Sequence, residues 1–289
     1  MKLSWNLPVY ALGAVALTGC HGHVGQTQER ARQFSGVTLQ DVTFHSAALG
    51  RDVTYRVYLP ARIETGERLP VVYLLHGAWE NYRSWSDYSD AGALAAKGMV
   101  LVMPDGALSY WVNAAGAPED KYGDFLLNDL RSDVERRFPA KSDRAARAVV
   151  GVSMGGFAAV EYALRRPELF SFAAALSPAI DAPERRFSWR RLEQSIRLRK
   201  VFGPDGSQER RNEDPFNLVQ MADPGKTPYL YITAGEQEAL LGPIRRFAGQ
   251  LDRRGFTHEF NTAPGGHGWG TWNRQTSGCF DVMMKVIVR

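Results

Sequence analysis

A serine framed by glycines stands where a predicted strand meets a predicted helix. Residues 151–156 read Gly-Val-Ser-Met-Gly-Gly, at the end of the apolar run 148–152 and before the helix-like segment 157–166. A serine hydroxyl is a poor nucleophile unless the fold presents it on a sharp turn beside a base, and flanking glycines let the backbone bend without a Cβ clash. The pattern in this context is typical of a nucleophile elbow, so Ser153 is the candidate nucleophile.

Apolar runs with helical stretches between them recur along the rest of the chain. Residues 38–46 and 51–59 alternate or run apolar across the short segment 47–50, which predicts an antiparallel hairpin. The later runs are near-continuous, as buried parallel strands require, and residues with helical periodicity lie between them. The sequence therefore predicts an α/β fold: a mostly parallel central sheet with helices on both faces and an N-terminal antiparallel hairpin. The predicted parallel strands cover 71–75, 99–103, 148–152, 172–176 and 229–233, a last strand covers 256–261, and helices cover 123–138 and 244–254.

The length of 289 residues and the 44% hydrophobic content suit one large catalytic domain, which we place at 37–289. One segment, 181–226, breaks the strand–helix rhythm and is rich in Arg, Pro, Asp and Asn. We interpret it as an insertion that covers the rim of the active site. Within it, apolar residues at near-helical spacing among the arginines of 185–200 predict an amphipathic surface helix, with a solvated face as the default and an anionic lipid or polysaccharide contact as the alternative.

The N-terminus has the features of an export signal. Residues 1–19 combine a charged start with a short apolar core, and they end in Leu-Thr-Gly before Cys20, which resembles a bacterial lipobox. We expect cleavage before Cys20, attachment of lipid to its thiol, and a flexible tether over 20–36. The alternative is an ordinary signal cleaved nearby. Either way the protein is expected to be exported, and the lipobox favours a lipid anchor in the bacterial cell envelope, with the membrane as a partner.

Charge, cysteine content and motifs limit the binding partners, disulfide bonds and cofactors that we expect. The formal net charge of +4 falls to +3 once Lys2 leaves with the signal, and the arginines form no concentrated polybasic face, so nucleic acid is not an expected partner. A lipidated Cys20 would leave Cys279 as the other cysteine, with no thiol to pair with inside the chain. No metal-binding motif is visible, and the chemistry expected of Ser153 needs no cofactor.

Serine catalysis needs a base and a carboxylate that orients it. Of the six histidines, His267 alone lies in a C-terminal glycine-rich loop that could carry an imidazole over the end of a sheet. The loop after the predicted strand 229–233 offers two acids, and we choose Glu238 over Glu236, with Asp252 third because it falls inside a predicted helix. The order Ser, Glu, His agrees with the chain order of α/β-hydrolase triads.

Two backbone N–H groups are candidates for an oxyanion hole. Met154 directly follows the nucleophile, and Ala78 lies in the loop after the strand 71–75, where Gly77 permits the turn. Aromatic residues crowd the same loops, which suggests an aromatic-lined pocket for an acyl or aryl group. The candidate substrate-binding residues are Trp79, Tyr110, Trp111 and Trp269.

These motifs together resemble the esterase D or putative-esterase group of α/β-hydrolases, which includes S-formylglutathione hydrolases, feruloyl and acetyl esterases, and antigen 85 mycolyltransferases. The resemblance covers roughly Val37 to the C-terminus. It is carried by Tyr-Leu-Leu-His-Gly at 73–77, Met-Pro-Asp-Gly at 103–106, the elbow at 151–157, Arg-Pro-Glu-Leu-Phe at 166–170 and Gly-His-Gly-Trp at 266–269. It implies that Ser153 and His267 are catalytic and that the N–H groups of Ala78 and Met154 form the oxyanion hole.

The chain departs from that group at two positions. Relatives usually carry aspartate where this chain has Glu238, and often aspartate where it has Gly268. The leading hypothesis is a cofactor-independent serine carboxylesterase for small-molecule or carbohydrate-linked acyl or feruloyl esters. The alternatives are an acyltransferase of the antigen 85 type, which passes the acyl group to a sugar hydroxyl, and a catalytically silent hydrolase fold that acts as an envelope binding protein.

Overall fold

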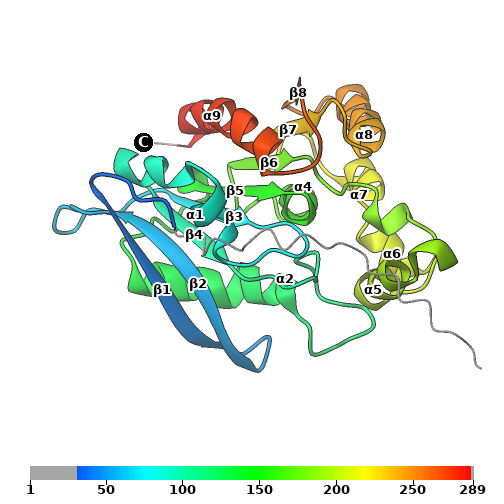
Figure 1. Cartoon of the computed structure of the whole chain (residues 1–289), viewed down its shortest axis with the longest axis horizontal. Helices are drawn as coiled ribbons and strands as arrows, with labels where there is room; N and C mark the ends of the chain where they lie inside the picture. The colour runs from blue at the N-terminus through cyan, green and yellow to red at the C-terminus, as the bar shows by residue number, and fades with distance from the viewer. Residues whose placement is uncertain (1–30, 288–289) are drawn as a thin grey trace, which may run out of the picture. The chain divides into compact units, whose positions relative to one another are not determined.

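Eight strands of the computed structural model form one sheet (Figure 1). The structure describes residues 31–287, so the predicted signal peptide, the lipidation site at Cys20 and most of the predicted tether lie outside the described residues. The strands, in chain order, are β1 (Val37–Ser46), β2 (Arg51–Pro60), β3 (Val71–Leu75), β4 (Val100–Pro104), β5 (Arg147–Val152), β6 (Phe172–Leu176), β7 (Tyr229–Gly235) and β8 (His258–Ala263).

The strand order in the sheet is β1-β2-β4-β3-β5-β6-β7-β8. The pairs β1–β2 and β2–β4 are antiparallel, and every pair from β4 to β8 is parallel. This confirms the predicted hairpin and the mostly parallel sheet. The last strand begins two residues later than predicted, because Phe256 is buried and its N–H bonds the carbonyl of Leu251 at the end of the preceding helix.

Side chains on the central strands pack alternately against two apolar layers, as the period of a strand requires. On β3, Val71, Tyr73 and Leu75 enter one core cluster, whereas Val72 and Leu74 enter the other. Because both faces are buried, these strands are continuously apolar. The longer helices are η2 (Phe125–Leu130, a π-helix) continuing into α3 (Arg131–Arg137), α4 (Met154–Arg165), α5 (Leu192–Phe202), α8 (Leu241–Arg254) and α9 (Trp269–Val286).

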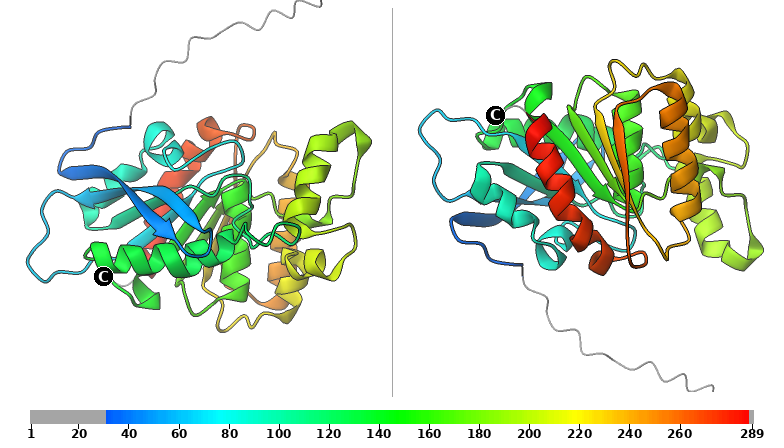
Figure 2. Two further views of the ribbon diagram at one scale, coloured as in Figure 1. Left: turned by 90° about the horizontal axis from the view of Figure 1, so that it is seen from below. Right: turned by 90° about the horizontal axis from the view of Figure 1, so that it is seen from above.

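Helices cover both faces of the sheet, as predicted (Figure 2). The cluster on one face includes Phe157 and Ala158 of α4 and Phe247 of α8, and the cluster on the other includes Cys279 and Met283 of α9. The helix α9 was not among the predicted elements. Short helical segments connect the rest: α1 (Ser84–Tyr88), η1 (Ala91–Lys97), α2 (Tyr122–Asp124), η3 (Arg144–Ala146), η4 (Ala182–Glu184), η5 (Trp189–Arg191), α6 (Gln208–Asn212) and α7 (Pro215–Met221).

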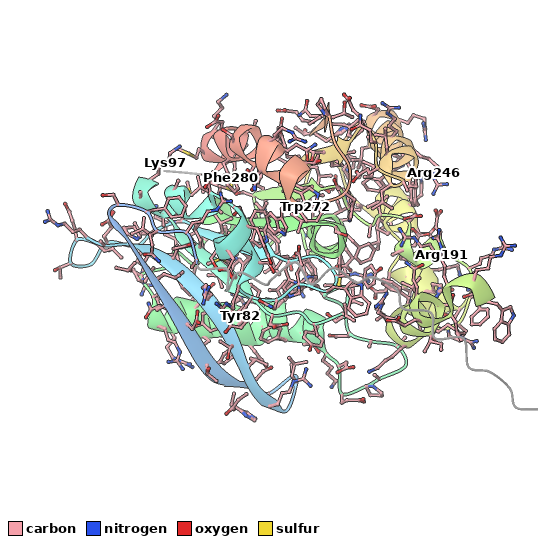
Figure 3. The ribbon with its side chains drawn as sticks, in the orientation of Figure 1. Tyr82, Lys97, Arg191, Arg246, Trp272 and Phe280 are labelled. Atoms are coloured by element: carbon pink, nitrogen blue, oxygen red, sulfur yellow. The ribbon has the colours of Figure 1, made fainter. Side chains whose placement is uncertain are left out.

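The segment 181–226 between β6 and β7 is mostly helical. Its helix α7 packs against both α4 and α8, so this part belongs to the layer that covers the sheet. The predicted amphipathic helix is present as η5 and α5, with Leu198 buried and Ile196 exposed. Arg191 lies on the outer side of the segment, away from the sheet (Figure 3). Within residues 31–287, no helix combines the length and the apolar character needed to cross a bilayer.

Candidate active site

The turn between β5 and α4 holds Ser153 in a strained conformation. Its φ of 53° and ψ of −110° are rare for a residue with a side chain, and such strain costs on the order of 1–3 kcal/mol. Hydrogen bonds hold the turn from both sides: the Ser153 N–H donates to Leu176 O at 2.9 Å, and the Ser153 carbonyl accepts the N–H groups of Phe157 and Ala179, each at 3.0 Å. The core strands therefore fix where the hydroxyl points.

The glycines around Ser153 avoid Cβ clashes, as expected, but they do so without an unusual backbone conformation. Neither Gly151 nor Gly155 has a positive φ, so the turn does not use their backbone freedom. Instead the backbone passes through very close contacts. A Cβ on Gly151 would lie 2.1 Å from the carbonyl of Gly155, and a Cβ on Gly155 would lie 2.3 Å from the carbonyl oxygen of Leu75. The glycines let α4 begin against β5 and β3.

Ser153, His267 and Glu238 form a continuous hydrogen-bonded chain. Ser153 Oγ lies 2.8 Å from His267 Nε2, and His267 Nδ1 lies 2.9 Å from Glu238 Oε2. An ionised carboxylate can only accept, so in this arrangement Nδ1 carries the proton and Nε2 is free to accept the hydroxyl proton of Ser153. The Glu238 side chain is fully buried, while that of His267 is 36% exposed. The imidazole can thus reach both the serine and solvent.

Two paired loops place the acid beside the base. The N–H groups of Glu236 and Gln237 donate to the carbonyls of Ala263 and Gly265, each at 3.0 Å, which joins the loop after β7 to the loop after β8. Glu238 then turns inward, and its Oε1 accepts the N–H of Gly235 at 3.1 Å. Glu236, the alternative acid, is exposed. The third candidate, Asp252, lies in α8, 3.6 Å from Nε2 of His258, and takes no part in this chain of contacts.

The histidine of the loop after β3 has a structural role. His76 is fully buried, its Nε2 accepts the N–H of Gly106 at 2.9 Å, and its Nδ1 lies 2.7 Å from the carbonyl oxygen of Gly77. Because Nε2 accepts, Nδ1 must carry the ring proton and donate to Gly77. His76 thereby joins the loops that follow β3 and β4.

The candidate oxyanion donors lie close to Ser153. Met154 is the first residue of α4, where a backbone N–H has no acceptor within the helix. The turn with Ala78 packs directly against the elbow, since a Cβ on Gly77 would lie 3.3 Å from Ser153 Cβ. These loops are strained elsewhere too: within residues 31–287 the non-glycine residues with positive φ all follow β3, β4, β5 or β6, and they are Trp79, Ala107, Tyr110, Trp111, Ser153 and Ser177.

The four aromatic residues predicted to bind substrate have different environments. Trp79 is 69% exposed, and Trp269 is partly buried beside His267. Tyr110 and Trp111 are only 5% and 0% exposed, so the prediction that they line a pocket needs correction. Trp111 packs edge-on against the His76 ring, and Tyr110 packs against Phe157 and Phe202 in the core. Both turned inward because burial of a large ring is more favourable than exposure in a loop.

A cavity that the sequence did not indicate lies between the loop 107–122 and α5. Its volume is about 480 Å³, and its walls include Leu108, Tyr122, Ile196 and Arg197. The Arg197 guanidinium also lies 4.8 Å from the centre of the Trp79 ring, next to the candidate donor Ala78. The segment 181–226 therefore reaches Trp79, the residue next to the candidate oxyanion donor Ala78. The sequence carries no signal for this contact, because Trp79 and Arg197 are 118 positions apart and only the fold brings them together.

Glu80 is the second feature that sequence reasoning missed. Its Oε2 accepts the N–H of Gly77 at 2.8 Å, and its Oε1 accepts the indole N–H of Trp269 at 2.6 Å. Burial raises the pKa of this carboxyl above its usual value, although both hydrogen bonds and the nearby His76 and His267 act to lower it. The sequence signal that could have pointed to Glu80 is a carboxylate among aromatic residues in the loop after a buried strand.

Among residues 31–287, no group of three His, Cys, Asp or Glu side chains is arranged to hold a metal ion.

Comparison with known proteins adds the family. Residues 46–278 match the model of a protein family described as Putative esterase. The chain is 26% identical over 268 residues to an acetyl esterase of Caldicellulosiruptor saccharolyticus, covering 86% of this chain and 99% of that protein. It is 28% identical over 271 residues to an endo-1,4-beta-xylanase/feruloyl esterase of Xylanibacter ruminicola, covering 87% of this chain and 31% of that protein.

A third relative carries out acyl transfer according to its name. The chain is 30% identical over 189 residues to the diacylglycerol acyltransferase/mycolyltransferase Ag85B of Mycobacterium avium, covering 61% of this chain and 55% of that protein. Among solved structures, a ferulic acid esterase superposes with a TM-score of 0.75 at 22% identity, over 87% of this chain and 99% of that one. That likeness shows the shared fold.

Proposed function

The chain belongs to the Putative esterase family of α/β-hydrolases and is a carboxylesterase-type serine hydrolase, and from this premise we propose that it cleaves acyl or feruloyl-type esters through a Ser153–His267–Glu238 triad. The observation that carries the proposal is the hydrogen-bonded chain from Ser153 Oγ through His267 to the buried Glu238 carboxylate. A strained serine beside a base whose far side meets a carboxylate is the arrangement that activates a hydroxyl for acyl transfer.

In the proposed mechanism, Ser153 Oγ attacks the ester carbonyl carbon while His267 Nε2 takes the hydroxyl proton. The Glu238 carboxylate accepts a hydrogen bond from Nδ1–H of His267 and stabilises the imidazolium that forms. The N–H groups of Met154 and Ala78 stabilise the tetrahedral oxyanion. His267 then returns the proton to the departing alcohol, and water attacks the acyl-enzyme by the same steps to release the acid.

The substrate proposal rests on the named relatives, an acetyl esterase and a xylanase/feruloyl esterase. We expect the purified protein to hydrolyse p-nitrophenyl acetate, butyrate and octanoate and methyl ferulate, with short acyl or feruloyl groups preferred over octanoate. Initial rates over this panel measure the preference. Absence of turnover on all four esters would contradict the hydrolase proposal and favour a silent binding protein.

Acyl transfer to a sugar hydroxyl is the second candidate function, and the Ag85B relative favours it. The same acyl-enzyme would serve both reactions, since only the nucleophile of the second step differs. Product partition separates them: with a sugar acceptor supplied, a transferase yields more acylated sugar than free acid. A hydrolase yields free acid whether or not the acceptor is present.

Export and lipid attachment at Cys20 are also part of the proposal. The support is the sequence of residues 1–20, with its short apolar core and the Leu-Thr-Gly-Cys end. In a bacterial host, an alkyne-labelled fatty acid should be incorporated into the full chain, and a Cys20→Ala variant should lose the label. Equal labelling of both chains would place the lipid elsewhere, and labelling of neither would favour an ordinary cleaved signal.

A further inference from the structure

Glu80 joins the turn that carries Ala78 to the beginning of α9, next to the loop of His267. Its Oε2 holds the Gly77 N–H in the turn that presents Ala78, and its Oε1 holds the indole N–H of Trp269, the first residue of α9. The contact between Glu80 and Trp269 joins residues 189 positions apart in the chain. Within residues 31–287, no other hydrogen bond joins the turn 77–80 to the segment 264–269.

Trp269 transmits this contact to the imidazole through packed aromatic rings. Its ring centre lies 5.2 Å from that of Trp272, at a nearly perpendicular angle, and Trp272 lies 5.2 Å from His267 in the same geometry. On its other side, Trp269 packs edge-on against Trp85 and stacks on Tyr88 of α1. Trp272 lies near the beginning of α9 (Figure 3). The position of Trp269 therefore bears on the position of His267.

We propose that Glu80 is a positioning residue, which holds the Ala78 turn and the beginning of α9 in fixed relation so that the oxyanion donor and the imidazole converge on Ser153. This inference rests on the proposed esterase function. Each carboxylate oxygen accepts a hydrogen bond from a protein donor, and these two bonds tie the loops together. Errors in such convergence weaken the transition state more than the bound substrate, so the effect falls on kcat rather than on KM.

The two donors demand a carboxylate specifically. A glutamine at this position has one acceptor oxygen and one NH2 group, so it can satisfy either Gly77 or Trp269 but must set its NH2 against the other N–H. Replacing Trp269 by phenylalanine removes one of the two donors and keeps an aromatic ring. The amide of Glu80→Gln can then accept from Gly77 alone, without facing a second donor.

The test is a double-mutant cycle of Glu80→Gln and Trp269→Phe, measured as kcat and KM on p-nitrophenyl acetate. We expect Glu80→Gln to lower kcat about 10- to 100-fold with KM changed less than about threefold. Trp269→Phe is expected to lower kcat about threefold, and the double variant should regain most of the activity that Glu80→Gln loses. Matched controls are Glu64→Gln and Trp189→Phe, both at exposed positions away from the contact.

Thermal unfolding of the wild type, the two single variants and the double variant of this cycle separates this inference from the esterase proposal. Each single variant should lower Tm by about 2–4 °C, with the double variant close to Trp269→Phe alone. If no ester is turned over, the esterase proposal is wrong, but the Tm values of the cycle still test the contact between Glu80 and Trp269. Additive effects in the Tm cycle would overturn the contact, and a Glu80→Gln variant with full kcat would overturn its positioning role in an active enzyme.

Discussion

Ser153→Ala is expected to lower kcat for ester hydrolysis by about 10⁵- to 10⁶-fold, because it removes the hydroxyl that forms the acyl-enzyme in the proposed mechanism. The backbone of the turn should survive the change, since its hydrogen bonds to Leu176, Phe157 and Ala179 use only main-chain atoms. His267 loses one hydrogen bond, but its contact with Glu238 is independent of the serine. Initial rates on p-nitrophenyl acetate, corrected for spontaneous hydrolysis, measure the loss.

Ser177→Ala is the matched control for this prediction. Ser177 follows β6, has a positive φ like Ser153, and its buried Oγ has no hydrogen-bond partner among residues 31–287. Loss of that hydroxyl should change kcat less than about threefold, because it forms no hydrogen bond with any residue of the proposed triad. Full activity in Ser153→Ala would show that another group is the nucleophile and would overturn the mechanism.

The sheet could be predicted from sequence because its signals are local. Strands buried on both faces must be apolar along their length, so runs such as 71–75 and 172–176 mark their own positions. The C-terminal helix Trp269–Val286 carries weaker signals. Gly270, Gly278 and several β-branched or hydroxyl residues have low helix propensity, and the helix is stabilised by packing Cys279 and Met283 against the sheet. Tertiary contacts therefore outweigh local preference in α9.

The candidate site also has a part that the sequence could predict and a part that depends on tertiary contacts. Ser153, Glu238 and His267 lie in loops that follow β5, β7 and β8, and the carboxyl ends of parallel strands meet at one edge of a sheet, so their convergence was predictable. The role of neighbouring side chains was not. Tyr110 and Trp111 stand in a loop by sequence but turn into the core, and Glu80 acquires its partners only when residues 77 and 269 are brought together. Direction of a loop side chain is set by packing.

Glu238→Gln is expected to lower kcat about 10⁴-fold, because glutamine can offer its NH2 group to His267 Nδ1 and stabilise the wrong tautomer. Nε2 would then carry the proton and could not accept one from Ser153. The change is nearly isosteric, and the amide oxygen can still accept the N–H of Gly235, so the fold should be retained. Activity on p-nitrophenyl acetate and Tm are measured together, which distinguishes lost catalysis from lost structure.

Glu236→Gln provides the comparison that decides between the two glutamates of this loop. Glu236 is exposed, and its backbone N–H rather than its side chain anchors the loop to Ala263, so this variant should retain kcat within about twofold. The Glu238 carboxylate meets His267 because Glu238 stands in a turn that begins at Gly235, where its Oε1 accepts the Gly235 N–H and its Oε2 lies beside Nδ1 of the imidazole. A Glu236→Gln variant that loses activity while Glu238→Gln retains it would reverse this assignment.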